Sequence, residues 1–357
     1  MRELDRICHA LREASVRGQG VVLATVMSVE GSVYRGAGAR MIVTAAGDTV
    51  GAVSGGCLEA DVVARAADLL ASRQAELVRY DTRASDESVM GLGMGCQGII
   101  GVLLEPLVDA SLQHAISFYD RLAARSDTAT LLTLLHPGAG DPPVGTRLLL
   151  DENGSVVEGD RLLLARAQAV AREVVSPAIR LVVCGGGTDA IPLARFAREL
   201  GWHVTVVDHR PSFVTATRFP DANALVCVNL TQDAGALAAH AALGERTMAV
   251  VMAHSASHDR AYLHAMLHAH ARYVGVLGPR KRTLELLGAR VSSRDGDMPA
   301  SVHSPVGLDL GAETPEEIAV SIVAEILAVT AGRHAGMLRE RHGPIHDRVD
   351  VPARPST

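Results

Sequence analysis

A cysteine stands at the end of a glycine turn, where a helix is expected to begin. In "AVSGGCLEAD" (residues 52–61), Gly55 and Gly56 precede Cys57, and the apolar spacing from Leu58 onward predicts a helix. A thiol at a helix N-terminus has its thiolate stabilised by the helix dipole and by free backbone N–H groups. Such a sulfur is soft and nucleophilic, so Cys57 is a candidate metal ligand and a candidate catalytic group. The alternative is that Cys57 is a small core residue and that the glycines only make turns.

Two arginines and a second cysteine could complete a ligand site around this turn. Arg35 and Arg40 lie in the glycine-punctuated stretch "GSVYRGAGAR" and could bind a phosphate through bidentate contacts. Cys96, in "GMGCQG", has similar glycine-rich surroundings. The candidate binding residues of this half of the chain are Arg35, Arg40, Ser54, Gly55, Gly56, Cys57 and Cys96.

A second glycine turn follows a buried-strand pattern in "LVVCGGGTDAIPLA". Gly185, Gly187 and Ala190 have the G-x-G-x-x-A spacing of dinucleotide-binding turns, and Asp208 ends the next predicted strand about 20 residues on. The glycines would allow the tight turn and the approach of a pyrophosphate to the helix start, and Asp208 could accept from a ribose hydroxyl. This pattern favours a phosphate-bearing ligand. The alternative is a Rossmann-like fold without a nucleotide, in which the glycines serve packing.

Further polar residues follow the later strands of this half. His254 ends one predicted strand, and "GVLGPRKR" ends the next. Ligands of open α/β sheets bind at the carboxyl ends of the strands. We therefore expect one crevice to be formed by Gly185, Asp208, His254, Gly278 and Arg280. The alternative for His254 is a hydrogen-bonded loop residue.

The surrounding patterns predict an α/β protein with two different halves. Residues 1–110 read as a compact α+β domain, and residues 111–176 as a connecting segment with strands and helices. In residues 177–335, strands alternate with helices, which predicts a Rossmann-like, doubly wound parallel sheet. The stretch "TPEEIAVSIVAEILAV" predicts a helix capped by Thr314 and Glu317. Residues 336–357 are assigned as a tail.

Composition narrows the class of protein. The chain has 357 residues, a net charge of −6 and 3% aromatic residues, which argues against a nucleic-acid surface. No uncharged apolar run approaches the ~20 residues of a membrane span. The five cysteines are odd in number and form no C-x-x-C pair, so we expect a reducing, cytoplasmic location. Cys8, Cys184 and Cys227 fall on helix or strand patterns and are expected in the core.

Several long strings resemble one protein family. "EGSVYRGAGARM", "GAVSGGCLEADVV", "VRYDT" and "GLGMGCQG" are similar to the N-terminal signature of the XdhC/CoxI family. "RYVGVLGPRKR", "TPEEIAVSIVAEILAV" and "GRHAGMLRER" resemble its C-terminal signature. The resemblance covers nearly the whole chain in the same order.

This resemblance implies an accessory protein of xanthine dehydrogenase and related molybdenum hydroxylases. Such a protein would bind molybdenum cofactor, as molybdopterin or its cytosine dinucleotide form, support its sulfuration by a cysteine desulfurase, and insert it into the apo-enzyme. The family also implies a homodimer, and a maturation factor rather than a catalyst of small-molecule turnover. Cys57 would ligate molybdenum or handle the sulfido ligand, with Cys96 as the second choice. Arg35, Arg40, Gly55 and Gly56 would hold the phosphate region of the pterin.

Two other functions remain open at this point. The first is an NAD(P)-dependent oxidoreductase, which rests on the glycine turn and Asp208. Against it, the sequence has no Tyr-x-x-x-Lys pair, because Lys281 has no tyrosine four residues before it. The second is a structural partner of the hydroxylase with no cofactor site, in which the glycine stretches are only turns.

Overall fold

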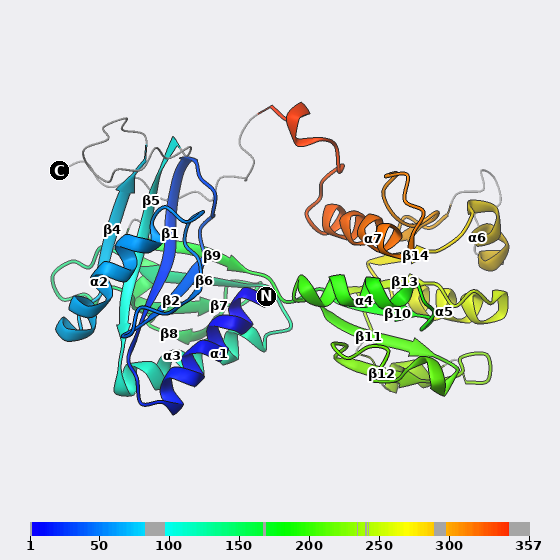
Figure 1. Ribbon diagram of the computed structural model, residues 1–357, viewed down its shortest axis with the longest axis horizontal. Coiled ribbons are helices and arrows are strands. Elements are labelled where there is room, and N and C mark those ends of the chain that lie inside the picture. The colour runs from blue at the N-terminus through cyan, green and yellow to red at the C-terminus, as the bar shows by residue number, and fades with distance from the viewer. Residues whose placement is uncertain are drawn as a thin grey trace. The chain divides into compact units, whose positions relative to one another are not determined.

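The computed structural model divides the chain into two compact units (Figure 1). Unit 1 comprises Glu3–Pro177 and unit 2 comprises Ala178–Met337, so the chain divides after Pro177. The residues that the structure describes are 2–82, 97–166, 169–233, 235–239, 241, 243–288 and 298–342. Among them, no helix combines the length and the apolar character needed to cross a membrane.

Unit 1 is built on a five-stranded antiparallel sheet in the order β3-β2-β1-β5-β4. Its strands are β1 (Val21–Ser32), β2 (Arg40–Thr44), β3 (Thr49–Gly51), β4 (Glu76–Asp81) and β5 (Gln97–Leu107). Side chains alternate between two cores, because successive residues of a strand point to opposite faces. Val22 and Ala24 of β1 pack under α2 (Glu59–Ser72). Val21 and Leu23 face α1 (Arg2–Val16) and α3 (Asp109–Ala123).

A second sheet completes unit 1 and accounts for most of the expected connecting segment. It has four antiparallel strands in the order β8-β7-β6-β9. They are β6 (Ala129–Leu134), β7 (Arg147–Leu150), β8 (Val156–Gly159) and β9 (Val170–Val175), with the short helix η1 (Arg161–Ala165) before β9. Residues 111–176 therefore belong to the same compact unit as the first sheet.

Buried ion pairs tie the two sheets of unit 1 together. Arg40 of β2 binds Glu173 of β9 through Nη1–Oε1 and Nη2–Oε2 distances of 3.0 and 2.6 Å. Arg147 of β7 is hydrogen-bonded to Glu105 of β5. Both guanidiniums lie within 5.6 Å of the centre of the Tyr119 ring on α3. The charged groups are thus paired inside the protein, as buried charges must be.

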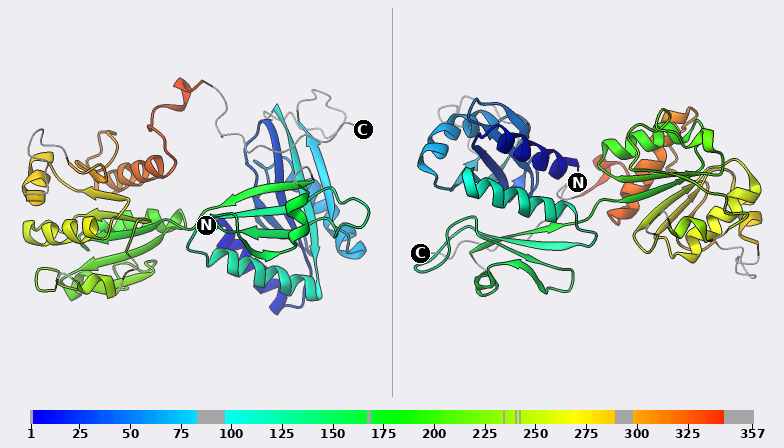
Figure 2. Two further views of the ribbon diagram at one scale, coloured as in Figure 1. Left: turned by 180° about the vertical axis from the view of Figure 1, so that it is seen from behind. Right: turned by 90° about the horizontal axis from the view of Figure 1, so that it is seen from below.

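Unit 2 is a six-stranded parallel sheet with helices on both faces (Figure 2). The strands are β10 (Arg180–Cys184), β11 (His203–Asp208), β12 (Ala224–Cys227), β13 (Thr247–Val251), β14 (Tyr273–Val276) and β15 (Val302–His303). One face is covered by α4 (Ala190–Glu199) and α7 (Pro315–Thr330), and the other by α5 (Ala256–His268) and α6 (Arg280–Leu287). The spatial order β12-β11-β10-β13-β14-β15 is the 3-2-1-4-5-6 order of dinucleotide-binding folds. The predicted fold class is therefore confirmed, as is the Thr314–Glu317 capping box of α7.

Candidate functional site

The loop that carries Cys57 is closed by the hydroxyl of Ser54. It joins β3 to α2. Ser54 Oγ accepts hydrogen bonds from the backbone N–H groups of Gly56, Cys57 and Leu58, at 3.1, 3.0 and 3.1 Å. These are the N–H groups that the sequence predicted to be free for a thiolate or an anion. In the structure they already have an oxygen partner.

The side chain of Glu59 completes this arrangement, and sequence reasoning missed it. Its carboxylate accepts from the N–H groups of Val53 and Ser54 at 3.1 and 2.8 Å, and also from the Ser54 hydroxyl. Burial favours a higher pKa for Glu59, but these hydrogen bonds outweigh burial and lower its pKa. The sequence did contain a signal for it. A serine precedes the helix and an acidic residue lies in the first turn, which is the pattern of helix caps.

Cys57 is half-buried at the edge of the core beneath α2. The ring of Tyr34, an exposed residue, lies beside Gly55, 3.4 Å from where a Cβ would stand. Gly56 has a φ of +112°, a conformation that favours glycine, and it faces open space. Cys57 therefore lies in a fixed turn that is open on its glycine side.

The other described cysteines have different surroundings. The thiols of Cys8, Cys57, Cys184 and Cys227 are free within the described part of the chain. Cys8 and Cys184 are buried as predicted, and burial raises the pKa of Cys8 to about 11 and that of Cys184 further. The prediction for Cys227 was wrong, because it ends the edge strand β12 and is exposed. Cys96 lies outside the described residues.

The two arginines proposed for phosphate binding are paired with carboxylates of the protein. Arg35 forms an ion pair with Glu3 of α1. Arg40 is 6% exposed and binds Glu173. Burial would lower the pKa of Arg40, but the charge of Glu173 outweighs burial and raises it. A phosphate would have to replace these partners, so a role of either arginine in binding remains a prediction.

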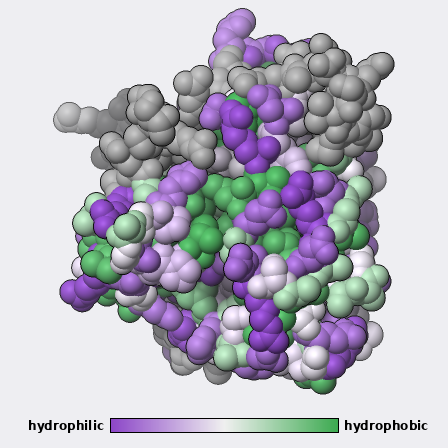
Figure 3. Space-filling view, turned by 90° about the vertical axis from the view of Figure 1, so that its left-hand side faces the viewer, coloured by the Kyte–Doolittle hydropathy of each residue, from purple (hydrophilic) through white to green (hydrophobic). Residues whose placement is uncertain are grey.

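Apolar side chains gather on one hollowed face of unit 1, with hydrophilic side chains around them (Figure 3). Contiguous apolar surface of this kind is typical of a face that binds a partner or a ligand.

In unit 2, the glycine turn lies at the carboxyl end of β10, as predicted. Asp208 ends β11 directly beside it and has no exposed surface. Its carboxylate accepts from the N–H of Gly186 at 2.8 Å and from the guanidinium of Arg210 at 2.9 and 2.8 Å. Burial favours a higher pKa for Asp208, but the bonds from Arg210 and Gly186 outweigh it and lower the pKa to about 2.

His254 meets the same turn from the end of β13. It has a φ of +55°, uncommon for a residue with a side chain. Its ring lies 3.7 Å from where a Cβ on Gly187 would stand, and its Nε2 is 3.3 Å from Asp189 Oδ2. Arg280 begins α6 after β14 and is exposed at the same edge of the sheet. The structure thus brings Gly185, Gly187, Asp208 and His254 together.

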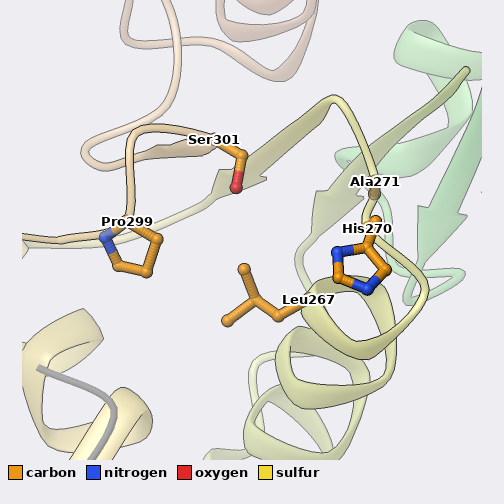
Figure 4. Close-up of a pocket in the computed structure, with 5 residues that line it drawn as sticks. All are labelled: Leu267, His270, Ala271, Pro299 and Ser301. Atoms are coloured by element: carbon orange, nitrogen blue, oxygen red, sulfur yellow. The ribbon is translucent and has the colours of Figure 1, made fainter. Parts of the chain in front are cut away.

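One cavity in unit 2 lies away from these residues (Figure 4). It has a volume of about 520 Å³ and is lined by Leu267, His270, Ala271, Pro299 and Ser301. Leu267 reaches into it from the end of α5, while Ala271 and Ser301 precede β14 and β15. The cavity is therefore at the amino ends of the strands, opposite the glycine turn. Within the described residues, no group of three or more His, Cys, Asp or Glu side chains is arranged to hold a metal ion.

Comparison with known proteins identifies the family. Residues 14–81 match the XdhC and CoxI family, and residues 181–326 match the XdhC Rossmann domain. The chain is 32% identical to a probable xanthine dehydrogenase subunit of Bacillus subtilis, over 89% of this chain and 96% of that one. It is 24% identical to the molybdenum cofactor insertion chaperone PaoD of Escherichia coli, over 89% and 86% of the two chains. A crystal structure described as a xanthine dehydrogenase from Bacillus halodurans superposes with a TM-score of 0.76 at 31% identity, over 93% of this chain and 98% of that one.

These similarities extend through both units, and they agree with the fold and with the two glycine-rich turns. The chain belongs to the XdhC and CoxI family, with a C-terminal XdhC Rossmann domain.

Proposed function

We propose that this protein binds molybdenum cofactor, supports its sulfuration and inserts it into a molybdenum hydroxylase of the xanthine dehydrogenase type. Two kinds of evidence support the proposal. A relative that matches most of the chain is named as an insertion chaperone for this cofactor, and another is named as a probable subunit of xanthine dehydrogenase. The structural observation that carries it is Cys57, a half-buried free cysteine on a loop fixed by Ser54 and Glu59.

One atom of this loop, the sulfur of Cys57, has the chemistry to bind a molybdenum-bearing ligand. A cysteine sulfur is a soft donor that binds soft metals or carries a sulfur atom. Cys57 would hold the cofactor or its transferable sulfur, and the cofactor would supply the molybdenum centre that the client needs. Ser54 and Glu59 would keep the turn in one conformation, so that the sulfur meets its ligand with little loss of entropy. Arg35, Arg40, Gly55 and Gly56 are the groups proposed to contact the pterin phosphate. The two arginines would exchange Glu3 and Glu173 for it.

The proposed partners follow from the same function. They are an apo molybdenum hydroxylase as client, a cysteine desulfurase as sulfur donor, and a second copy of this chain. We propose that these encounters take place in the cytoplasm. Mass spectrometry of the retained ligand distinguishes molybdopterin from its cytosine dinucleotide form.

The test measures cofactor retention and client activation together. The protein is purified gently with the cofactor, and bound pterin and molybdenum are quantified by mass spectrometry and metal analysis. We expect about one cofactor per chain for wild type and a loss of at least about tenfold in affinity for Cys57→Ser, the scale of one broken ligand contact. Cys227→Ser is the matched control, because it removes an exposed thiol from unit 2. Normal client activation by Cys57→Ser would remove Cys57 from the mechanism, and absence of bound cofactor in wild type would refute the function itself.

A further inference from the structure

The fold of unit 2 implies a dinucleotide site, and its crevice can be tested for fit. In sheets of this strand order, the pyrophosphate lies on the glycine turn after the first strand. The adenosine ribose then lies beside the acidic residue that ends the second strand. Here these places correspond to the turn at Gly185–Gly187 and to Asp208.

Asp208 has no capacity left for a ribose hydroxyl. Its Oδ1 accepts from the backbone N–H and the Nε of Arg210, both at 2.9 Å. Its Oδ2 accepts from the N–H of Gly186 and from Arg210 Nη2, both at 2.8 Å. A carboxylate offers about four lone-pair sites, so these four bonds use them all. Asp208 is also completely buried, and a ribose could reach it only if Arg210 left.

The segment after β11, residues 209–219, covers the glycine turn, and we call it the strap. The carbonyl oxygen of Phe213 occupies the space where a side chain on Gly186 would begin. Arg218 Nη2 donates to the carbonyl of Gly186 at 2.9 Å. The guanidinium of Arg210 lies 3.5 Å from the centre of the Phe213 ring, and that of Arg218 lies 5.1 Å from it. The strap is therefore attached to the turn by hydrogen bonds, cation–π contacts and close packing.

Two stacked histidine rings connect the strap to α5. The ring of His209, on the strap, lies 3.6 Å from that of His258, on α5, with an angle of 13° between the planes. The strap follows β11 and α5 follows β13, and β10 lies between these two strands. The contact thus spans the end of β10, beside the point where the strand order reverses.

Two of the three glycines of the turn are explained by contacts within the chain. A Cβ on Gly185 would stand 2.6 Å from the backbone of Ala253, and its φ is +118°. Gly186 is covered by Phe213. Beside Gly187, the carboxylate of Asp189 lies close to the helix start, where a pyrophosphate would meet a negative charge. Packing within the chain therefore accounts for Gly185 and Gly186 without a nucleotide, whereas Gly187 has room for a methyl group.

We infer that the strap occupies the nucleotide crevice of unit 2, so that the protein does not bind a nicotinamide dinucleotide there in the usual pose. The crevice is filled by Phe213, by the Asp208–Arg210 pair and by the His209–His258 stack. An NAD(P)-dependent oxidoreductase would therefore have no binding site for its cofactor at this turn. The same exclusion applies to the nucleotide end of a cytosine dinucleotide at this turn.

The experiment opens the strap and measures nucleotide binding by calorimetry with NADH and NADPH. Wild type is expected to show no binding up to about 1 mM ligand, a free energy weaker than about −4 kcal/mol. The double variant Arg210→Ala/Phe213→Gly frees Asp208 and removes the ring that Arg210 and Arg218 contact, so that the strap is held less firmly over Gly186. We expect its affinity to rise by at least about tenfold. Arg246→Ala, an exposed arginine of the same unit, is the matched control.

Micromolar binding of NADH by wild type would overturn the inference. It is overturned equally if the folded double variant binds no better than wild type, because the strap would then not be what excludes the nucleotide. Thermal unfolding verifies that each variant is folded. If the double variant is not, Arg210→Ala alone is used, since it frees Asp208 and is judged by the same two outcomes.

Discussion

The Cys57 loop of unit 1 and the glycine turn of unit 2 look alike in sequence and differ in what they leave accessible. In both, backbone N–H groups bind a side-chain oxygen of the protein: Ser54 Oγ in the first and Asp208 Oδ2 in the second. The groups that close the Cys57 loop come from the loop and the first turn of α2, and Cys57 stays partly exposed. The turn of unit 2 is covered by the strap. A glycine pattern therefore predicts a turn but not its occupant.

The largest expected effect concerns unit 1, which carries the Cys57 loop, and the ion pair between its two sheets. Arg40→Ala leaves Glu173 as an unpaired charge between the sheets, and it should lower the free energy of unfolding by about 3–5 kcal/mol. Urea unfolding measures this free energy. Arg121→Ala is the control, because it breaks the exposed Arg121–Glu158 pair and should cost about 0–1 kcal/mol. A stable Arg40→Ala protein that no longer retains cofactor would instead support a phosphate-binding role.

The second prediction separates packing from ligand binding at the glycine turn. Gly185→Ala combines a φ of +118° with a contact at 2.6 Å, so it should destabilise unit 2 by about 3 kcal/mol. Gly187→Ala adds a methyl group at 3.7 Å from His254, an ordinary contact, and should change stability by less than about 0.5 kcal/mol. Thermal unfolding of both variants measures the two losses of stability. Equal effects would mean that packing does not distinguish these glycines.

The third prediction is a pH dependence that belongs to unit 2. The pKa of Asp208 is lowered to about 2 in the folded protein, against about 3.9 in an unfolded chain. The stabilisation by its ionised form is therefore present above about pH 4 and is lost as the pH falls toward 2, and it amounts to about 2.5 kcal/mol.

Unfolding measured between pH 5 and pH 2 should show this loss in wild type. Asp208→Asn should lack it and be less stable than wild type at neutral pH. If the two proteins lost stability in parallel on acidification, the Asp208–Arg210 contact would not be what holds the strap.

The smallest effect concerns the Cys57 loop itself. Ser54→Ala removes the oxygen that accepts three N–H groups, and it should cost about 1–2 kcal/mol. The loosened loop should also raise the rate of Cys57 alkylation by iodoacetamide several-fold, as followed by mass spectrometry. Ser72→Ala, at the exposed end of α2, is the control and should leave the rate unchanged. An unchanged rate in Ser54→Ala would show that Ser54 does not position the cysteine.

Much of the fold could be predicted because local patterns and tertiary packing agree. The alternation of strands and helices after residue 177 predicted the parallel sheet, and Thr314 and Glu317 form the predicted capping box. The second sheet of unit 1 was only partly foreseen, because antiparallel strands pair through contacts distant in sequence, such as β6 with β9. Cys227 was misjudged because an edge strand and a buried strand share the same composition.

The sequence by itself determined where the two turns lie and which family the chain belongs to. These features depend on short-range spacing: a cysteine after two glycines, and a glycine turn between a strand and a helix. Only the tertiary structure decided which N–H groups bind Ser54 and Asp208, and that Arg40 faces Glu173. Those partners are chosen by burial, because a polar group enclosed by the fold must bind whatever the fold brings near it.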